Sequence, residues 1–229
     1  MKKKVVVISL GGSLIAPEHI DAVFLDKFKK TLKKYSKTRK FVIVCGGGTV
    51  ARNYMQALAK EKVPEIELSL AGMRATRANA VFMMQFFGKE ANASLPLDMR
   101  HVKNELLKNN IVICGALRFV PKTTSDSTAA RLARYLKSPF INMTNVKGLY
   151  TANPHTHKNA KFIPSISWKD FEKKARKMHY KNGQHFVLDQ HAATLIRKHK
   201  IPTYIIGKWL NNLKNIISNK KFIGTTISG

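Results

Sequence analysis

The sequence is poor in acidic residues. It contains 13 Asp and Glu against 41 Lys and Arg in 229 residues, so its formal net charge is +28. No dedicated metal cage can be recognised among the few carboxylates. The lysines are spread over the polar faces of amphipathic segments, whereas nucleic-acid binders usually gather cations and aromatic residues in one patch. This distribution favours a basic surface that attracts anionic substrates, and a nucleic-acid partner stays open as the less favoured alternative.

Cysteines and long apolar runs are also scarce. The two cysteines, Cys45 and Cys114, each end an apolar strand-like run, and such a lone pair is more typical of reduced core thiols than of a disulfide. Apolar stretches are strand-sized and interrupted by charges, so we expect no membrane span. The first residues, MKKKVVVISLGGSLI, lack the small-residue cleavage site of a signal peptide. We therefore expect a cytoplasmic protein with no membrane partner.

Hydrophobic residues make up 44% of the chain, enough for the core of one domain spanning residues 1–229. Apolar periodicity predicts alternating strands and helices. The predicted strands are 4–10, 41–44, 111–114, 140–144 and 203–206, and the predicted helices are 20–35, 50–61, 65–87, 126–136 and a segment after residue 189. Asp126 and Asp189 are the expected N-caps of the last two helices. The alternation predicts an α/β fold, a three-layer α/β/α sandwich around a mostly parallel sheet.

Glycine-rich turns follow the first two predicted strands. SLGGSLI comes after the first, and VCGGGTVARNY comes after the second. Three consecutive glycines indicate that something approaches the main chain closely. Because ligands collect at the carboxyl ends of parallel strands, two turns rich in backbone N–H groups predict a phosphate site, with Arg52 as a nearby cation. Neither turn matches the P-loop or the dinucleotide fingerprint, so those two mechanisms are excluded.

Seven motifs together resemble one known family. LGGSLI, CGGGTVARNY, GMRATRANAV, TTSDSTAARLA, TNVKGLYTANP, VLDQHAATLI and GTTI occur in this order. Their order and spacing are similar to those of the amino acid kinase superfamily, and most similar to its archaeal-type uridylate (UMP) kinases. The resemblance covers the chain from end to end. It implies an ATP- and Mg²⁺-dependent kinase of pyrimidine nucleotide biosynthesis that phosphorylates UMP and forms a homo-oligomer, a dimer-based hexamer.

The resemblance also implies roles for individual residues, with acceptor binding in the N-terminal half and ATP binding in the C-terminal half. Asp126 would organise the active site, and Arg52 would lie between the two nucleotides as a second catalytic residue. The ATP side would comprise Gly11, Gly12, Ser13, Gly48, Arg52, Thr144, Asn145, Tyr150 and Asn153. The acceptor side would comprise Gly46, Gly47, Ser69, Thr123, Thr124 and Ser125. No residue is predicted to be a dedicated metal ligand.

Several positions depart from the family pattern. Ser9 stands where many members carry a lysine, and Ser69 stands where an acidic residue usually contacts the UMP ribose. Lys147 and Asn153 each replace an aspartate in the TNVKGLYTANP motif. Losing one ribose hydrogen bond costs on the order of 1 kcal/mol, so the change at Ser69 loosens acceptor discrimination without abolishing UMP binding.

The segment 115–126 departs furthest, because it is about two residues longer than the family pattern and gains Arg118 and Lys122. Both cations are expected to bind the acceptor phosphate, and the less favoured alternative is that they are two more surface cations. Two alternatives to a UMP kinase stay open. One is a related kinase acting on another small phosphate or carboxylate, and the other is a catalytically inactive nucleotide- or RNA-binding protein.

Overall fold

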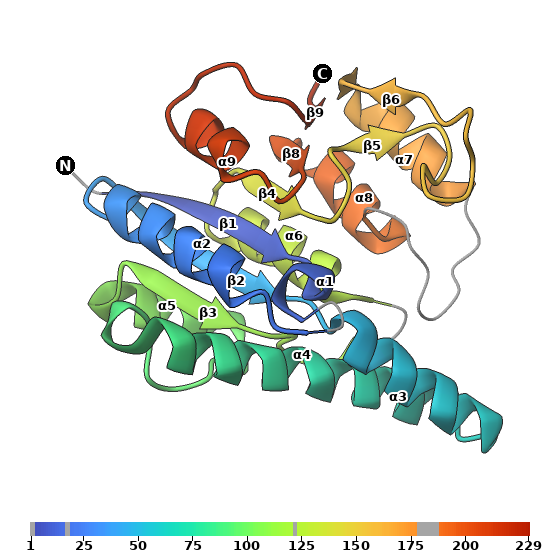
Figure 1. The fold of residues 1–229 in the computed structure, drawn as a ribbon, viewed down its shortest axis with the longest axis horizontal. Helices are drawn as coiled ribbons and strands as arrows, with labels where there is room; N and C mark the ends of the chain where they lie inside the picture. Colours follow the sequence, from blue (N-terminus) through green and yellow to red (C-terminus); the bar gives the residue numbers. More distant parts are fainter. Residues whose placement is uncertain (1–2, 17–18, 121–122, 178–187) are drawn as a thin grey trace.

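The computed structural model describes residues 3–16, 19–120, 123–177 and 188–229, and Lys122 lies outside these ranges. A seven-stranded sheet runs through the middle of the molecule in the order β3-β2-β1-β4-β8-β9-β7 (Figure 1). All neighbouring strands pair in parallel except β8 and β9. The strands are β1 (Lys4–Leu10), β2 (Arg39–Cys45), β3 (Ile111–Cys114), β4 (Phe140–Met143), β7 (Ser165–Ile166), β8 (Thr203–Ile206) and β9 (Thr225–Ile227). A separate pair joins β5 (Leu149–Tyr150) to β6 (Phe162–Ile163).

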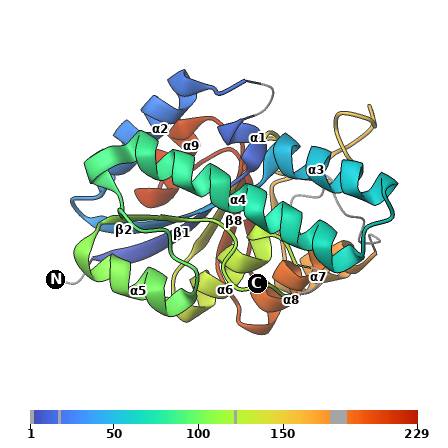
Figure 2. The ribbon, with the colours of Figure 1, turned by 90° about the horizontal axis from the view of Figure 1, so that it is seen from below.

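Helices cover both faces of the sheet and form one hydrophobic cluster on each face. The first face carries α1 (Gly12–Ile15), α2 (Ala22–Tyr35), α4 (Glu65–Phe87) and α9 (Leu210–Ile217). The second face carries α5 (Met99–Lys108), α6 (Ser125–Tyr135), α7 (Trp168–Arg176) and α8 (Gln190–Lys198). Helix α3 (Gly48–Lys60) lies along α4 at one end of the molecule, and a short turn η1 (Gly88–Glu90) follows α4 (Figures 1 and 2). The predicted fold class is confirmed.

The central strands show why this sequence forms a sheet buried on both faces. In β1 and β2, five consecutive residues of each strand are buried, as expected for parallel strands covered on both sides. Successive side chains alternate between the two clusters, so that Ile8 packs with α2 and α4 while Val7 packs with α5 and α6. Central β1 therefore belongs to both cores, and the residues at its end are held firmly.

Most predicted elements are present, with ends displaced by one or two residues. The predictions for β1, α4, β3 and β8 match the observed bounds. Asp189 caps α8 by accepting a hydrogen bond from Ala192 N at 2.7 Å, as predicted. The prediction that Asp126 caps α6 is wrong. Thr124 is the cap, and its hydroxyl accepts from Asp126 N at 3.1 Å, which leaves the Asp126 carboxylate available for other contacts.

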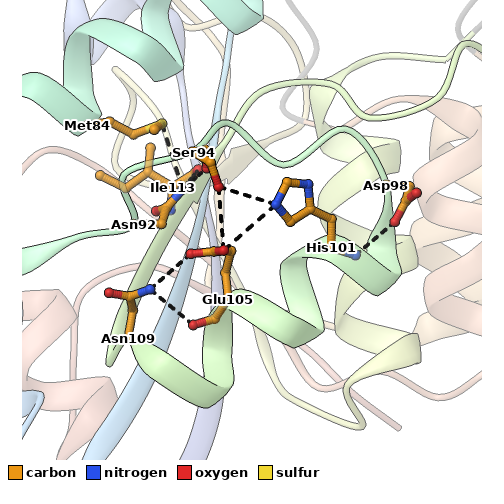
Figure 3. A network of polar contacts seen from close by, with 8 residues as sticks. All are labelled: Met84, Asn92, Ser94, Asp98, His101, Glu105, Asn109 and Ile113. Atoms are coloured by element: carbon orange, nitrogen blue, oxygen red, sulfur yellow. Dashed lines mark hydrogen bonds and ion pairs between the residues drawn. The ribbon is translucent and has the colours of Figure 1, made fainter.

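The edge strand β3 is closed by a side chain. Asn92 lies beside it, accepts from Ile113 N at 2.6 Å and donates to Ile113 O at 3.0 Å (Figure 3). The amide thereby takes the place of a neighbouring strand at an otherwise open sheet edge. Asn92 is only 2% exposed, so these bonds form away from water. The end of β3, which leads into the 115–126 segment, is fixed by this contact.

Cys45 and Cys114 are free, buried thiols on β2 and β3, as predicted. Burial raises the pKa of both thiols, so neither is a nucleophile at neutral pH. Within the described ranges, no helix combines the length and the hydrophobicity that crossing a bilayer requires.

Candidate functional site

A cavity of about 1010 Å³ opens at the carboxyl ends of β1, β2, β3 and β4. The strand order reverses at β1, because the chain first adds β2 and β3 on one side of it and then returns to place β4 on the other side. Open α/β sheets bind ligands at such a switch point. The cavity is therefore where the topology alone would place a site.

The two glycine turns, 11–13 and 46–48, pack against each other at the mouth of this cavity. A Cβ atom on Gly12 would lie 2.0 Å from Gly48 N, and one on Gly46 would lie 2.6 Å from Gly12 N. Gly48 also has a φ of +62°, a left-handed conformation that side chains rarely adopt. The consecutive glycines predicted that something approaches their main chain closely, and in the structure this is the main chain of the other glycine turn. This packing brings two sets of backbone N–H groups to one place.

Helix α4 supports the glycine turns and the beginning of the 115–126 segment. Asn79 donates to Gly46 O at 2.7 Å, Thr76 accepts from Ala116 N at 2.8 Å, and the Arg77 guanidinium donates to Ala116 O at 2.9 Å. A Cβ on Gly115 would lie 2.7 Å from the α4 backbone at residues 76 and 77. The TRANA motif therefore acts in this structure as a scaffold beneath the cavity.

Arg52 lies one turn into α3 and lines the cavity. Its Nη2 donates to Thr49 Oγ1 at 2.9 Å, which holds the guanidinium near the N-terminus of the helix. Partial burial lowers the pKa of Arg52, although an arginine stays charged at neutral pH. The side chain provides a positive group beside the two glycine turns, as the sequence predicted.

Asp126, in the first turn of α6, is a carboxylate that lines the cavity. Its Oδ1 accepts a hydrogen bond from Ser9 Oγ at 2.7 Å. Burial and the neighbouring Asp189 carboxylate raise the pKa of Asp126 to about 7, although the Ser9 bond acts in the opposite direction. Ser9 is fully buried and stands opposite Asn142 on the adjacent strand β4, and Asn142 also lines the cavity. Asn142 therefore lines the cavity directly, and Ser9 contributes to it through its hydrogen bond to Asp126.

Asp189, which also lines the cavity, joins α6 to α8. Besides capping α8, its carboxylate accepts from Thr124 N at 3.3 Å, from Ser127 N at 3.2 Å and from Ser127 Oγ at 2.7 Å, and it also accepts from the Thr124 hydroxyl. With the Ala192 N–H, five donors satisfy this one carboxylate. Asp189 is thus a positioning residue that fixes the start of α6, and therefore Asp126, against α8.

Arg118 lines the cavity and is also tied to α5. Its Nη2 lies 3.5 Å from Asp98 Oδ2, and 75% of its side chain is exposed. Asp98 caps α5 by accepting from His101 N at 2.8 Å (Figure 3). An exposed ion pair of this kind contributes little to stability. Breaking the ion pair with Asp98 therefore costs little free energy, and the Arg118 guanidinium can turn to a phosphate instead.

The opposite wall of the cavity follows β4. Thr144, Asn145, Tyr150 and Asn153 lie there, and the Tyr150 ring packs edge-on against Phe162 with centroids 5.6 Å apart. The Lys147 ammonium lies 4.7 Å from the centroid of the Phe162 ring, away from the cavity lining. The lysine that replaces the family's aspartate is thus turned to an aromatic pair on the small β5–β6 sheet.

The cavity collects every predicted site residue that the structure describes. On the predicted ATP side these are Gly11, Gly12, Ser13, Gly48, Arg52, Thr144, Asn145, Tyr150 and Asn153. On the predicted acceptor side they are Gly46, Gly47, Ser69, Arg118, Thr123, Thr124 and Ser125, with Asp126 between the two sides. The prediction for Lys122 lies outside the described residues. Their convergence is a finding, whereas the individual roles stay predictions.

Sequence reasoning missed three contributors to the site. Ser9 was noted only for the lysine it replaces, Asn142 was not noted, and Asp189 was interpreted only as a helix cap. The available signal for Ser9 and Asn142 was a single polar residue within an otherwise apolar strand, in VVVISL and FINM. Such a residue near the carboxyl end of a central strand is a candidate for a ligand site.

Comparison with known proteins agrees with this geometry. The model of the amino acid kinase family matches residues 4–207. The uridylate kinase of Thermococcus kodakarensis is 34% identical over 204 residues, which are 89% of this chain and 90% of that protein. The uridylate kinase of Thermoplasma volcanium is 32% identical over 97% of this chain and 96% of that protein. The crystal structure of uridylate kinase from Archaeoglobus fulgidus superposes with a TM-score of 0.84 at 29% identity and covers 97% of this chain and 99% of that one. Because the family model matches most of the chain and relatives that are 34% and 32% identical match 89% and 97% of it, the chain belongs to the amino acid kinase family.

Proposed function

We propose that this protein is a phosphotransferase that moves the γ-phosphoryl group of ATP to UMP, a step of pyrimidine nucleotide biosynthesis. The observation that carries the proposal is the convergence of both predicted nucleotide sides on one cavity. Its volume of about 1010 Å³ lies at the upper end of the range for ligand pockets, about 300–1,000 Å³. The archaeal relatives that match 89% and 97% of the chain are named uridylate kinases, which supports UMP as the acceptor.

The glycine turns would hold the phosphates. Phosphoryl transfer needs accurate positioning and neutralisation of charge more than covalent catalysis. Backbone N–H groups of the turns 11–13 and 46–48, at the starts of α1 and α3, supply donors without the cost of ordering long side chains. Arg52 adds a charge at the junction. Because the two turns pack closely against each other, these donors are held in position by the fold itself.

Asp126 would organise the reacting phosphates. Its Oδ1 is occupied by Ser9, and its position is fixed through the contacts of Asp189 with Thr124 and Ser127. Mg²⁺ accepts oxygen ligands and is usually bound by one or two carboxylates together with substrate phosphates. Asp126 fits that role, whereas the five donors on Asp189 leave it no capacity. Among the described residues, no group of three or more metal-binding side chains forms a protein-only cage. Bound Mg²⁺ would neutralise charge on the β- and γ-phosphates.

UMP would occupy the side formed by α4, the 46–48 turn and the 115–126 segment, and ATP the side that follows β4. On the acceptor side, Arg118 would exchange Asp98 for the UMP phosphate. Ser69 lines this side in place of an acidic residue and offers the ribose a shorter, neutral partner.

We also propose a cytoplasmic homo-oligomer, a dimer-based hexamer, in which the exposed apolar residues of α4, Ile66 and Val81, contact a second copy. Sedimentation of the purified protein tests the subunit number.

An acceptor panel tests the proposed function. ADP release from ATP, measured with Mg²⁺ and UMP, CMP, AMP or a non-nucleotide phosphate, should be fastest with UMP. Faster release with another acceptor would identify a related kinase. No release with any acceptor, together with retained ATP binding by calorimetry, would indicate an inactive nucleotide-binding protein.

A further inference from the structure

A second concave site lies on the first face of the molecule, away from the catalytic cavity. It is a groove of about 740 Å³ between α2 and α9, which lie side by side (Figure 2). The two sites share no lining residue. We call this site the α2–α9 groove, and its charged and aromatic lining residues of interest are Lys27, Lys30, Lys34, Lys208, Trp209 and Lys214.

The groove is strongly positive. Five lysines line it, and the single carboxylate among its lining residues, Asp21, accepts from Phe24 N at 3.0 Å as the cap of α2. Lys30 pairs with Asp26 at 2.7 Å, whereas Lys27, Lys34 and Lys208 have neither a hydrogen bond nor an ion pair from their ammonium groups to any described residue. Unpaired cations side by side repel one another, so an anionic ligand would relieve this repulsion.

The lysines form a row and not a single cluster. Lys27, Lys30 and Lys34 follow the i, i+3, i+7 spacing of one helix face, so the row extends for about 10 Å along α2 at 1.5 Å per residue. Lys208 and Lys214 flank the groove from the α9 side. A row of this length suits a chain of successive phosphates better than one terminal phosphate group.

An unpacked aromatic ring completes the site. Trp209 is 68% exposed, although tryptophan is usually the most costly side chain to leave in water, and it immediately precedes α9 at the groove. Positive grooves with exposed aromatic rings are how proteins bind single-stranded nucleic acid, because bases stack on the rings while cations follow the backbone. We propose that the α2–α9 groove binds single-stranded nucleic acid.

The two tryptophans make the proposal directly measurable. Trp168 lies on α7 and donates to Ile201 O at 3.1 Å, so W168F leaves Trp209 as the only tryptophan. In this background, a 12-nucleotide oligocytidylate without terminal phosphates, added with UMP and ADP present, should quench the Trp209 fluorescence. Binding should weaken as salt rises, with a slope of about −0.7 for each phosphate neutralised.

Matched variants separate the groove from the general positive charge. K27A/K34A should weaken binding about tenfold and reduce the salt slope by about 1.4, the share of two phosphates. W209L, followed by fluorescence anisotropy of a labelled oligonucleotide, should weaken binding at least about fivefold and leave the slope unchanged, because it removes stacking only. K169A/K173A removes two exposed lysines from α7 and should change neither quantity.

Three results would overturn the proposal. Equal losses in K27A/K34A and K169A/K173A would mean that binding is nonspecific. Inorganic polyphosphate that binds as tightly as the oligonucleotide, with no effect of W209L, would mean an anion site without stacking. Self-association that W209L abolishes, without any oligonucleotide binding, would mean that a second copy of the chain occupies the groove.

Discussion

The catalytic cavity and the α2–α9 groove are both proposed to bind phosphate-containing ligands, yet they are built differently. The cavity is formed by residues that follow four different strands, and its side chains include only four Lys and Arg among the described lining residues, together with two aspartates. The groove is lined from α2 and the start of α9 and contains five lysines. The difference teaches that a net charge of +28 need not be concentrated where the reaction occurs. Backbone amides can position a phosphate in the cavity, whereas lysine side chains on a helix can attract one along the groove.

The largest effect is expected at Asp126 in the cavity, because its carboxylate caps no helix, whereas Asp21, the carboxylate of the groove, caps α2. D126N keeps the size of the side chain and does not remove the helix cap, which is Thr124. Turnover should fall by about 10²–10³-fold, the cost typical of losing one electrostatic group of an active site. Initial rates of ADP release measure this, with circular dichroism as the check of folding. Turnover near that of the natural chain would remove Asp126 from the reaction.

The same variant should change how stability depends on pH. The folded pKa of Asp126, about 7, lies above its ordinary value of 3.8, so the folded state holds this proton more tightly than the unfolded state. The contribution of Asp126 to the free energy of unfolding should therefore decrease as pH rises from about 4 to about 7, and the difference between the natural chain and D126N isolates it from the other carboxyl groups. The asparagine of D126N has no carboxyl group that titrates, so the variant avoids the cost of a buried charge. It should be more stable than the natural chain at pH 8 and similar to it at pH 3.5. Urea unfolding of the ligand-free protein at both pH values tests this, and parallel curves would contradict it.

The next effect concerns the glycine turns, which hold the backbone amides of the cavity in place. Gly48 and Gly88 have similar positive φ angles, +62° and +58°. A Cβ on Gly48 would lie 2.7 Å from Gly12 C, whereas one on Gly88 would have nothing within 4 Å. Gly88 also has a ψ of −132°, and residues with a side chain rarely adopt this pair of angles, so G88A should lower stability by about 1–3 kcal/mol through backbone strain alone. G48A should add about 1–3 kcal/mol from overpacking and should also reduce activity.

Thermal unfolding and ADP release measure both variants, and G88A is the matched control for strain. If G48A and G88A lost the same stability and both kept full activity, the packing of one turn on the other would not matter for the site.

Arg52 should have a smaller, purely functional effect. R52A should lower kcat/KM by about 10- to 100-fold, as expected for one charge-assisted contact of about 1.5–3 kcal/mol. Stability should change little, because the guanidinium has Thr49 as its only hydrogen-bond partner among the described residues. K60A, at the other end of α3, is the control and should leave kcat/KM unchanged. Equal losses of stability and activity in R52A would indicate a structural arginine.

The smallest effect is expected at Arg118, because its side chain is mostly exposed to solvent, like that of a surface cation. R118A and K122A should each raise the KM for UMP about tenfold and leave the KM for ATP unchanged. D98N keeps a good cap for α5 but releases Arg118 from its ion pair, so it should leave the KM for UMP equal or lower. Small, salt-sensitive changes in both KM values would instead assign these cations to the general surface. The acceptor phosphate would then depend on the 46–48 turn and Arg52.

Local patterns were sufficient for most of the fold and for much of the site. The apolar runs of β1 and β2, the helix periodicity of α4 and the cap at Asp189 depend on neighbouring residues, and all were predicted correctly. The positions of the glycine turns followed from the rule that ligands collect at the carboxyl ends of parallel strands. The cap of α6 was predicted wrongly because Thr124 and Asp126 are both good capping residues. The hydrogen bonds that Thr124 and Ser127 donate to the Asp189 carboxylate decide between them.

By itself, the sequence determined the order of elements, the family and many of the residues that line the cavity, because these depend on short motifs and on the order of those motifs along the chain. Tertiary structure alone decided that the consecutive glycines serve turn-on-turn packing, that Ser9 holds Asp126, and that Asp189 is saturated by donors of α6 and α8. It also decided that lysines from α2 and from around α9, more than 170 residues apart in the chain, line one groove. These features are contacts between segments distant in sequence, and their geometry is set by how the strands order and the helices pack, which no local pattern encodes.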